Sequence, residues 1–144
     1  FLATLLRINP RALSLKRQVG VQDVLDAADF DTLLDRLIQR ELHELQYRSV
    51  PDWFDFLGRI VNLEVVSADD ISRLAELKAT RDVHLHNGGI ANDTYLRKAG
   101  TLARAASGQR VPVPRPYVYD GADFLKAFIA RKAASARARF APAA

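Results

Sequence analysis

Apolar residues recur at steps of three and four along much of this 144-residue chain, which is the spacing of one face of an α-helix. The clearest run lies between residues 30 and 48, and its apolar positions are Leu33, Leu34, Leu37, Ile38, Leu42 and Leu45. Most charged residues of this run fall between those positions, so one face of the helix is apolar and the other is polar. The pattern predicts an amphipathic helix that packs against a core.

Residues that typically begin and end helices divide the rest of the chain. The expected helices cover residues 30–48, 51–63, 68–86, 92–106 and 120–138, with shorter helical pieces over 1–8, 10–19 and 21–28. Ser67 is predicted to cap the helix at 68–86, and Asp120 the helix at 120–138. Prolines at 112, 114 and 116 predict extended chain between 107 and 119. The predicted fold class is all-α, an antiparallel up-and-down bundle of four to five main helices.

Length and composition indicate a single domain over residues 1–144. Hydrophobic residues make up 49% of the chain, which is enough for a core. We expect that core over about 22–130, after a leading helical segment at 1–20 and before a basic Ala/Arg-rich tail at 131–144. The chain starts at Phe1 inside an apolar run and contains no methionine, which suggests a fragment of a longer protein.

Charge and cysteine content narrow the expected partners and cofactors. The formal net charge of +4 mildly favours a polyanionic partner, although it is also ordinary for a basic protein. The absence of cysteine excludes disulfides and thiolate metal sites. No apolar run reaches the roughly 20 residues that a membrane span needs, and no signal peptide is evident. We expect a cytoplasmic protein that does not contact membranes.

One short segment resembles a zinc signature but lacks its second ligand. His43-Glu44 begins the pattern His-Glu-x-x-His, and its fifth position is Tyr47. We therefore interpret His43 as a surface or boundary histidine and expect no metal and no cofactor.

The segment 81–89 reads Arg-Asp-Val-His-Leu-His-Asn-Gly-Gly and holds two of the three histidines. It is predicted to end a helix at the two glycines. Arg81 and His86 lie about 140° apart around an ideal helix, whereas Asp82 and His86 share a face. Asp82 can therefore orient the His86 imidazole. Arg81 joins the same site only if the helix end distorts or if a second copy of the chain contributes.

The arginine and histidine at this spacing, with Asp82 directly after the arginine, resemble the Arg-x4-6-His motif of HEPN domains. HEPN domains are small α-helical proteins, and many of them are RNases. Residues 90–98 also resemble the segment that restarts a helix after the motif, and the likeness covers roughly residues 22–130. The RiboL-PSP-HEPN-like branch is a candidate within the family. Gly88 stands where some HEPN toxins have a tyrosine that a partner nucleotidyltransferase modifies, which puts that partner in doubt.

The resemblance implies a metal-independent endoribonuclease in which a ribose 2′-hydroxyl attacks the adjacent phosphate, with a composite active site between two copies of the chain. His86 would move protons near neutral pH, and Arg81 would stabilise charge on the phosphate. The implied setting is bacterial defence or a toxin–antitoxin pair, with RNA, a second copy, and an antitoxin or an additional domain as partners. The expected catalytic residues are Arg81, Asp82 and His86, and the expected substrate-binding residues are His84, Asn87, Arg97 and Lys98.

Each motif residue also has an ordinary structural explanation. Arg81 can pair with a carboxylate, His86 is favoured by the dipole at a helix C-terminus, and the glycines end the helix. The alternative function is a catalytically silent HEPN module that binds nucleotide or RNA, or dimerises within a larger protein. A helical interaction domain without a nucleic-acid role is a third hypothesis.

Overall fold

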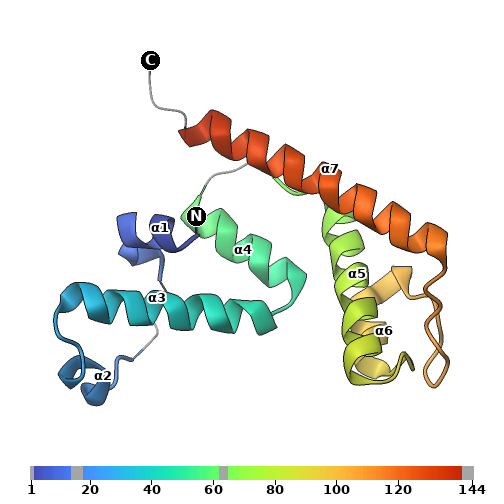
Figure 1. Cartoon of the computed structure of the whole chain (residues 1–144), viewed down its shortest axis with the longest axis horizontal. Helices are drawn as coiled ribbons and strands as arrows, with labels where there is room; N and C mark the ends of the chain where they lie inside the picture. Colours follow the sequence, from blue (N-terminus) through green and yellow to red (C-terminus); the bar gives the residue numbers. More distant parts are fainter. Residues whose placement is uncertain (1, 14–17, 62–64, 141–144) are drawn as a thin grey trace. The chain divides into compact units, whose positions relative to one another are not determined.

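The computed structural model describes residues 2–13, 18–61 and 65–140 of the chain. Within these ranges it contains seven α-helices, two 3₁₀ helices and no strand, which confirms the all-α prediction (Figure 1). The chain divides into two compact units, residues 1–48 with 52–62 and residues 49–51 with 63–144. The up-and-down order of the helices stays a prediction.

The first unit is organised around the helix that the sequence predicts most clearly. Its described helices are α1 (Leu2–Ile8), η1 (Pro10–Ala12), α2 (Val21–Leu25), α3 (Phe30–Tyr47) and the greater part of α4 (Val50–Ile60). Asp29 caps α3, because its side chain accepts a hydrogen bond from the Thr32 amide at 2.7 Å. The apolar face of α3 is buried, and the core of the unit comprises Leu6, Leu34, Ile38, Leu45 and Phe56.

The second unit carries the Arg-Asp-x3-His motif. Its described helices are α5 (Ala68–His86), α6 (Asp93–Ala99), η2 (Gly100–Leu102) and α7 (Arg115–Phe140). Ser67 caps α5 by accepting a hydrogen bond from the Asp70 amide at 3.1 Å, which confirms the predicted cap. The core of the unit comprises Ala79, Val83, Ala91, Tyr95, Ala99 and Val111. Residues 103–114 are non-helical and pair with the turn that follows α5 through the bridge between Ile90 and Arg110.

The prediction that the last helix starts at Asp120 is wrong, because α7 begins at Arg115. Pro116 lies in the first turn of α7, where a backbone N–H has no partner within the helix, so proline is tolerated there. The Val118 amide bonds to the Pro114 carbonyl at 3.3 Å and closes this turn. The segment 131–140, predicted as a tail, continues α7, and residues 141–144 lie outside the described residues.

Other helix ends also differ from the prediction. The helix at 92–106 is shorter than expected: α6 ends at Ala99, and Gly100 follows with a positive φ of 55°. The predicted helix at 10–19 is only the 3₁₀ turn Pro10–Ala12 where it is described, and 14–17 lie outside the described residues. α4 begins at Val50, one residue earlier than predicted, and ends at Ile60, and 62–64 lie outside the described residues.

Among the described helices, none combines the length and the apolar character that a membrane span requires. The same part of the chain contains no cluster of three or more histidine or carboxylate side chains that could hold a metal ion.

Candidate functional site

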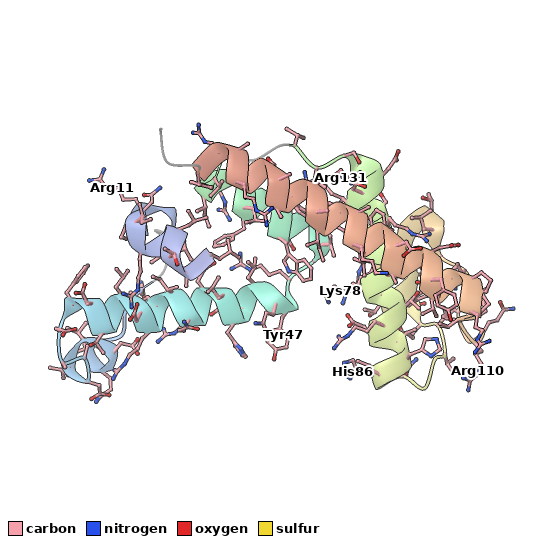
Figure 2. The ribbon with its side chains drawn as sticks, turned by 45° about the horizontal axis from the view of Figure 1, so that its top comes forward. Arg11, Tyr47, Lys78, His86, Arg110 and Arg131 are labelled. Atoms are coloured by element: carbon pink, nitrogen blue, oxygen red, sulfur yellow. The ribbon has the colours of Figure 1, made fainter. Side chains whose placement is uncertain are left out.

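An open hollow of about 240 Å³ lies between the C-terminal half of α5 and the helix α6. Figure 2 shows His86 at the C-terminal end of α5, with Lys78 about two turns earlier on the same helix. The residues that line the hollow are Ala79, Asp82, Val83, His86 and Asn87 together with Asn92, Thr94, Tyr95 and Lys98. Four of the seven residues predicted for the site, Asp82, His86, Asn87 and Lys98, therefore border one surface.

Helical spacing explains how α5 supplies both the core and the wall of the hollow. Ala79 and Val83, four residues apart, are buried against Tyr95 of α6. Asp82 and His86 have the same spacing and lie on the neighbouring strip of α5, beside this packed face. The Asn92 side chain caps α6 by accepting a hydrogen bond from the Tyr95 amide at 2.9 Å. The cap and the core together fix where α6 presents Lys98 to the hollow.

Asp82 is the centre of the charged groups at the hollow. Its carboxylate lies 2.9 Å from Lys78 Nζ, 2.9 Å from Arg81 Nη1 and 3.9 Å from Lys98 Nζ. Partial burial acts to raise the pKa of Asp82, but the hydrogen bond and charge of Lys78, the hydrogen bond of Arg81 and the charge of Lys98 outweigh it and lower that pKa. Asp82 is therefore ionised at neutral pH and cannot serve as a general acid.

Arg81 lies beside the hollow without lining it. Its side chain is 66% exposed and bonds to Asp82, the next residue. His86 is exposed and lines the hollow, as expected from its position one turn after Asp82. In the described part of the chain, no hydrogen bond joins Asp82 to His86, so the carboxylate binds cations rather than the imidazole. Within one copy of the chain, the side chains of Arg81 and His86 do not line the same hollow, in agreement with their angular separation on the helix.

His84 and Arg97, two of the predicted substrate-binding residues, do not line the hollow. The His84 ring donates a hydrogen bond from Nε2 to the Val111 carbonyl at 3.0 Å. This bond ties the end of α5 to the loop at 103–114. Arg97 is exposed on α6. Their roles in substrate binding stay predictions, and the contact of His84 gives it a structural role of its own.

The two glycines after the motif differ in what surrounds them. Both have positive φ, 58° at Gly88 and 79° at Gly89. A Cβ at Gly89 would lie 2.8 Å from Cε1 of His84, whereas a Cβ at Gly88 would meet nothing within 4 Å. Gly89 is thus required both by the backbone and by the packed His84 ring.

We expect Gly89→Ala to destabilise the second unit more than Gly88→Ala, which should cost about 1–2 kcal/mol for its left-handed backbone alone. Urea unfolding followed by circular dichroism measures both. In the His84→Ala background, Gly89→Ala should cost less than it does alone, because the imidazole ring that would clash with the new Cβ is absent. Equal costs for the two glycine variants would contradict the packing of His84 on this turn.

The sequence analysis missed a buried polar network in the same unit. Glu76, only 1% exposed, accepts hydrogen bonds from Thr80 Oγ1 at 2.8 Å and from Arg104 Nε at 2.9 Å. The Tyr117 hydroxyl donates to the same carboxylate, at 3.0 Å from Oε2, and the Arg104 guanidinium lies 3.6 Å from the centre of the Tyr117 ring. Burial is the largest effect on the pKa of Tyr117, and that pKa is raised. The hydroxyl therefore stays protonated at neutral pH and can donate a hydrogen bond.

This network joins α5, which forms one wall of the hollow, to the loop at 103–114 and to α7. A signal for it was present: Glu76 and Thr80 recur at helical spacing with the core residues Ala79 and Val83. A carboxylate buried on an apolar face requires a hydrogen-bonded cationic partner. The sequence did not indicate that Arg104, 28 residues away, provides it.

Comparison of the chain with known protein families finds no match, and neither do comparisons with curated proteins and with solved structures. The HEPN resemblance therefore rests on the motif and its helical context.

Proposed function

We propose that this chain is a metal-independent endoribonuclease that cleaves RNA by 2′-hydroxyl attack, and that its active site is composite, formed between two copies. The observation that carries the proposal is the hollow, where an exposed imidazole, His86, and an ammonium group, Lys98, border the same open surface. An acid–base group beside a cation is the combination that phosphodiester cleavage without a metal requires.

The chemistry assigned to His86 is a proton transfer in each direction. A neutral imidazole takes the proton of the ribose 2′-hydroxyl, and the 2′-oxygen forms a bond to the adjacent phosphorus. The bond from phosphorus to the 5′-oxygen of the next nucleotide breaks, and that oxygen takes up a proton from an imidazolium. In a pair of chains, one His86 acts as the base and the other as the acid. The products carry a 2′,3′-cyclic phosphate and a 5′-hydroxyl.

The charges around the hollow support a polyanionic substrate. Lys78, Arg81 and Lys98 gather round the single carboxylate of Asp82, so the cluster carries an excess of positive charge. A phosphate that approaches His86 would take one of these cations as its partner in place of Asp82. Arg81 suits this role best, because its exposed guanidinium presents a fork that matches two phosphate oxygens.

The composite arrangement explains why Arg81 lies outside the hollow of its own chain. A second copy packed against the end of α5 would bring its Arg81 toward the His86 of the first copy, by an isologous twofold contact. The exposed Leu85, between the two histidines, is available for such a contact. A bacterial defence or toxin–antitoxin setting is proposed on the resemblance alone.

A second candidate function is a catalytically silent HEPN module that binds nucleotide or RNA within a larger protein. The observation that favours it is the ion pair between Arg81 and Asp82, which occupies the arginine that catalysis would need. Such a module would retain the positive cluster and the hollow but leave the RNA intact.

The two functions are separated by incubating the purified protein with mixed RNA in EDTA and analysing both the products and the complexes. The endoribonuclease should produce fragments that end in 2′,3′-cyclic phosphate and begin with a 5′-hydroxyl. Binding without fragments, from a folded protein, would favour the silent module. Fragments that appear only when a divalent metal is supplied would contradict the proposed mechanism.

A further inference from the structure

Asp82 holds its three cations in unequal ways. Lys78 is the most buried partner: its Nζ lies 2.9 Å from Oδ2 of Asp82, one turn later on α5, and the two side chains are 21% and 22% exposed. Arg81 bonds to the other oxygen, Oδ1, but its side chain is 66% exposed. Lys98 Nζ lies 3.9 Å from Oδ2, which is beyond hydrogen-bond distance. Arg81 and Lys98 are therefore the two cations that a ligand can take from Asp82.

This exchange leaves Asp82 with a partner. If Arg81 and Lys98 both turn to a ligand, Lys78 still neutralises the carboxylate, so no part-buried charge is left unpaired. Asp82 is ionised at neutral pH, so the release of its cations involves no proton. Exposed ion pairs contribute little to stability, and the loss of two of them should not unfold the helix end. The cluster can thus supply two cations to an anionic ligand.

The two releasable cations are attached to different oxygens of the carboxylate. A single phosphate held by both cations would lie against Asp82, and two anions that are so close repel each other. Two phosphates avoid this repulsion if one lies at Lys98, which lines the hollow, and the other at Arg81, which lies beside it. Successive phosphates of one nucleic-acid strand meet this requirement, because the strand itself connects them across Asp82.

We propose that Asp82 and Lys78 form a positioning pair that releases Arg81 and Lys98 to two successive phosphates of one strand. The inference rests on the hollow as the RNA site of the proposed function, and it names the smallest ligand that fills the site, a strand with two phosphates. The scissile phosphate lies at Arg81 and its neighbour at Lys98. Asp82 and Lys78 act through these two cations.

Phosphate contacts can be counted without any cleavage. Short 2′-deoxy strands keep the phosphates but lack the nucleophile, so they stay intact under the proposed mechanism. Their binding to the full chain is measured by displacement of a labelled strand, followed by fluorescence anisotropy at several salt concentrations. The slope of log K against log salt is about −0.7 for each phosphate contact of a single strand.

A dinucleotide with one phosphate should therefore bind with a slope of about −0.7, and a trinucleotide with two phosphates should bind more tightly, with a slope of about −1.4. The second phosphate adds the contact with the second released cation. Equal slopes for the two ligands would overturn the proposal, because the site would then use only one cation.

Lys98→Gln should reduce the trinucleotide slope to about −0.7, because one of the two contacts is lost. Lys126→Gln is the matched control. It removes the same charge from the same unit, but Lys126 is 78% exposed on α7, pairs with Asp123 and does not line the hollow. It should leave the slope unchanged. Equal reductions in the two variants would show that the slope reports net charge, which would contradict the assignment of Lys98.

The positioning role of Asp82 has a readout that structural damage would not produce. Asp82→Asn should tighten trinucleotide binding by about two- to fivefold, the equivalent of a weak ion pair, because Arg81 and Lys98 are no longer held. Asp123→Asn removes the same charge away from the hollow and should change the affinity much less. Weaker binding by a folded Asp82→Asn chain, or an equal gain in both variants, would contradict this role.

The role of Lys78 is tested in two backgrounds. Lys78→Gln should weaken trinucleotide binding although Lys78 does not line the hollow, because Asp82 then retains Arg81 and Lys98 as its partners. In the Asp82→Asn chain, the same substitution should have almost no further effect. An equal loss in both backgrounds would mean that Lys78 acts through its charge alone, and the positioning pair would be wrong.

These outcomes are separable from those of the proposed function. Cleavage of all-ribose RNA together with equal salt slopes would overturn this inference alone. Unequal slopes without cleavage of all-ribose RNA would leave the two-phosphate site standing and remove the endoribonuclease assignment. Failure of both short strands to displace the labelled strand from a folded chain would overturn the inference, because the hollow would then bind no strand phosphate.

Discussion

The His86→Ala variant should cleave RNA about two to four orders of magnitude more slowly than the wild-type chain, the usual loss when a general acid–base group is removed. His86 lines the hollow and is exposed, so its removal takes away the proton carrier without leaving a buried cavity. Circular dichroism and thermal unfolding should therefore be almost unchanged. Rates are compared by single-turnover cleavage of a labelled RNA in EDTA.

Two other variants make the comparison specific. His43→Ala is the matched control, because His43 is an exposed histidine in the first unit, beside Tyr47 and far along the chain from the motif. It should retain full activity. Arg81→Lys should be impaired although its charge is kept, since an ammonium group cannot make the two parallel contacts of a guanidinium. Equal activity in wild type and His86→Ala would identify a contaminating nuclease and remove the basis of the assignment.

The largest expected effect on stability comes from Glu76. Glu76→Ala should lower the free energy of unfolding of the second unit by about 1.5–3 kcal/mol, because the part-buried Arg104 would lose its carboxylate partner. Thr80 and Tyr117 would lose their acceptor at the same time. Urea denaturation followed by circular dichroism measures the loss.

The matched control is an ion pair that joins the same two helices, α5 and α7. Arg131→Ala removes the ion pair between α7 and Asp70 of α5, and the Arg131 side chain is 51% exposed. Such an exposed pair should contribute no more than about 1 kcal/mol. A similar small loss for Glu76→Ala would mean that the buried network does not hold α7 and the loop at 103–114 against α5.

Local sequence signals predicted the helices whose ends carry polar caps. Ser67 and Asn92 both accept hydrogen bonds from amides three residues later, and the helices that follow begin where expected. The 18-residue α3 was predicted to within one residue, because its apolar stripe and its cap at Asp29 agree. These features depend on residues within one or two turns of each other, which a sequence pattern contains.

Features that depend on distant contacts were not predicted. The prolines near 114 were interpreted as excluding a helix, but Tyr117 in the first turn of α7 bonds to Glu76, 41 residues earlier, and the helix begins at Arg115. Likewise Arg104 was not recognised as the partner of Glu76. Tertiary contacts of this kind outweigh local preferences, and no single segment of the sequence contains them.

The candidate site also contains features that local spacing predicts and features that depend on distant contacts. Helical spacing placed Asp82 and His86 together, and both border the hollow, with Asn87 directly after the helix. The role of His84 could not be predicted, because it depends on Val111, 27 residues later in the chain. The cations around Asp82 come from α6 as well as α5, so that cluster also required the fold.

The most direct test of the proposed 2′-hydroxyl mechanism is cleavage, in EDTA, of two RNAs that differ by one oxygen atom. Once the cleaved position of a labelled RNA is mapped, the same sequence is made with a 2′-deoxy nucleotide immediately 5′ to the scissile phosphate. The mechanism requires that the all-ribose strand is cut there and that the substituted strand resists at that position, because the nucleophile is missing. Equal cleavage of both strands at that phosphate would contradict attack by the 2′-hydroxyl and the role assigned to His86.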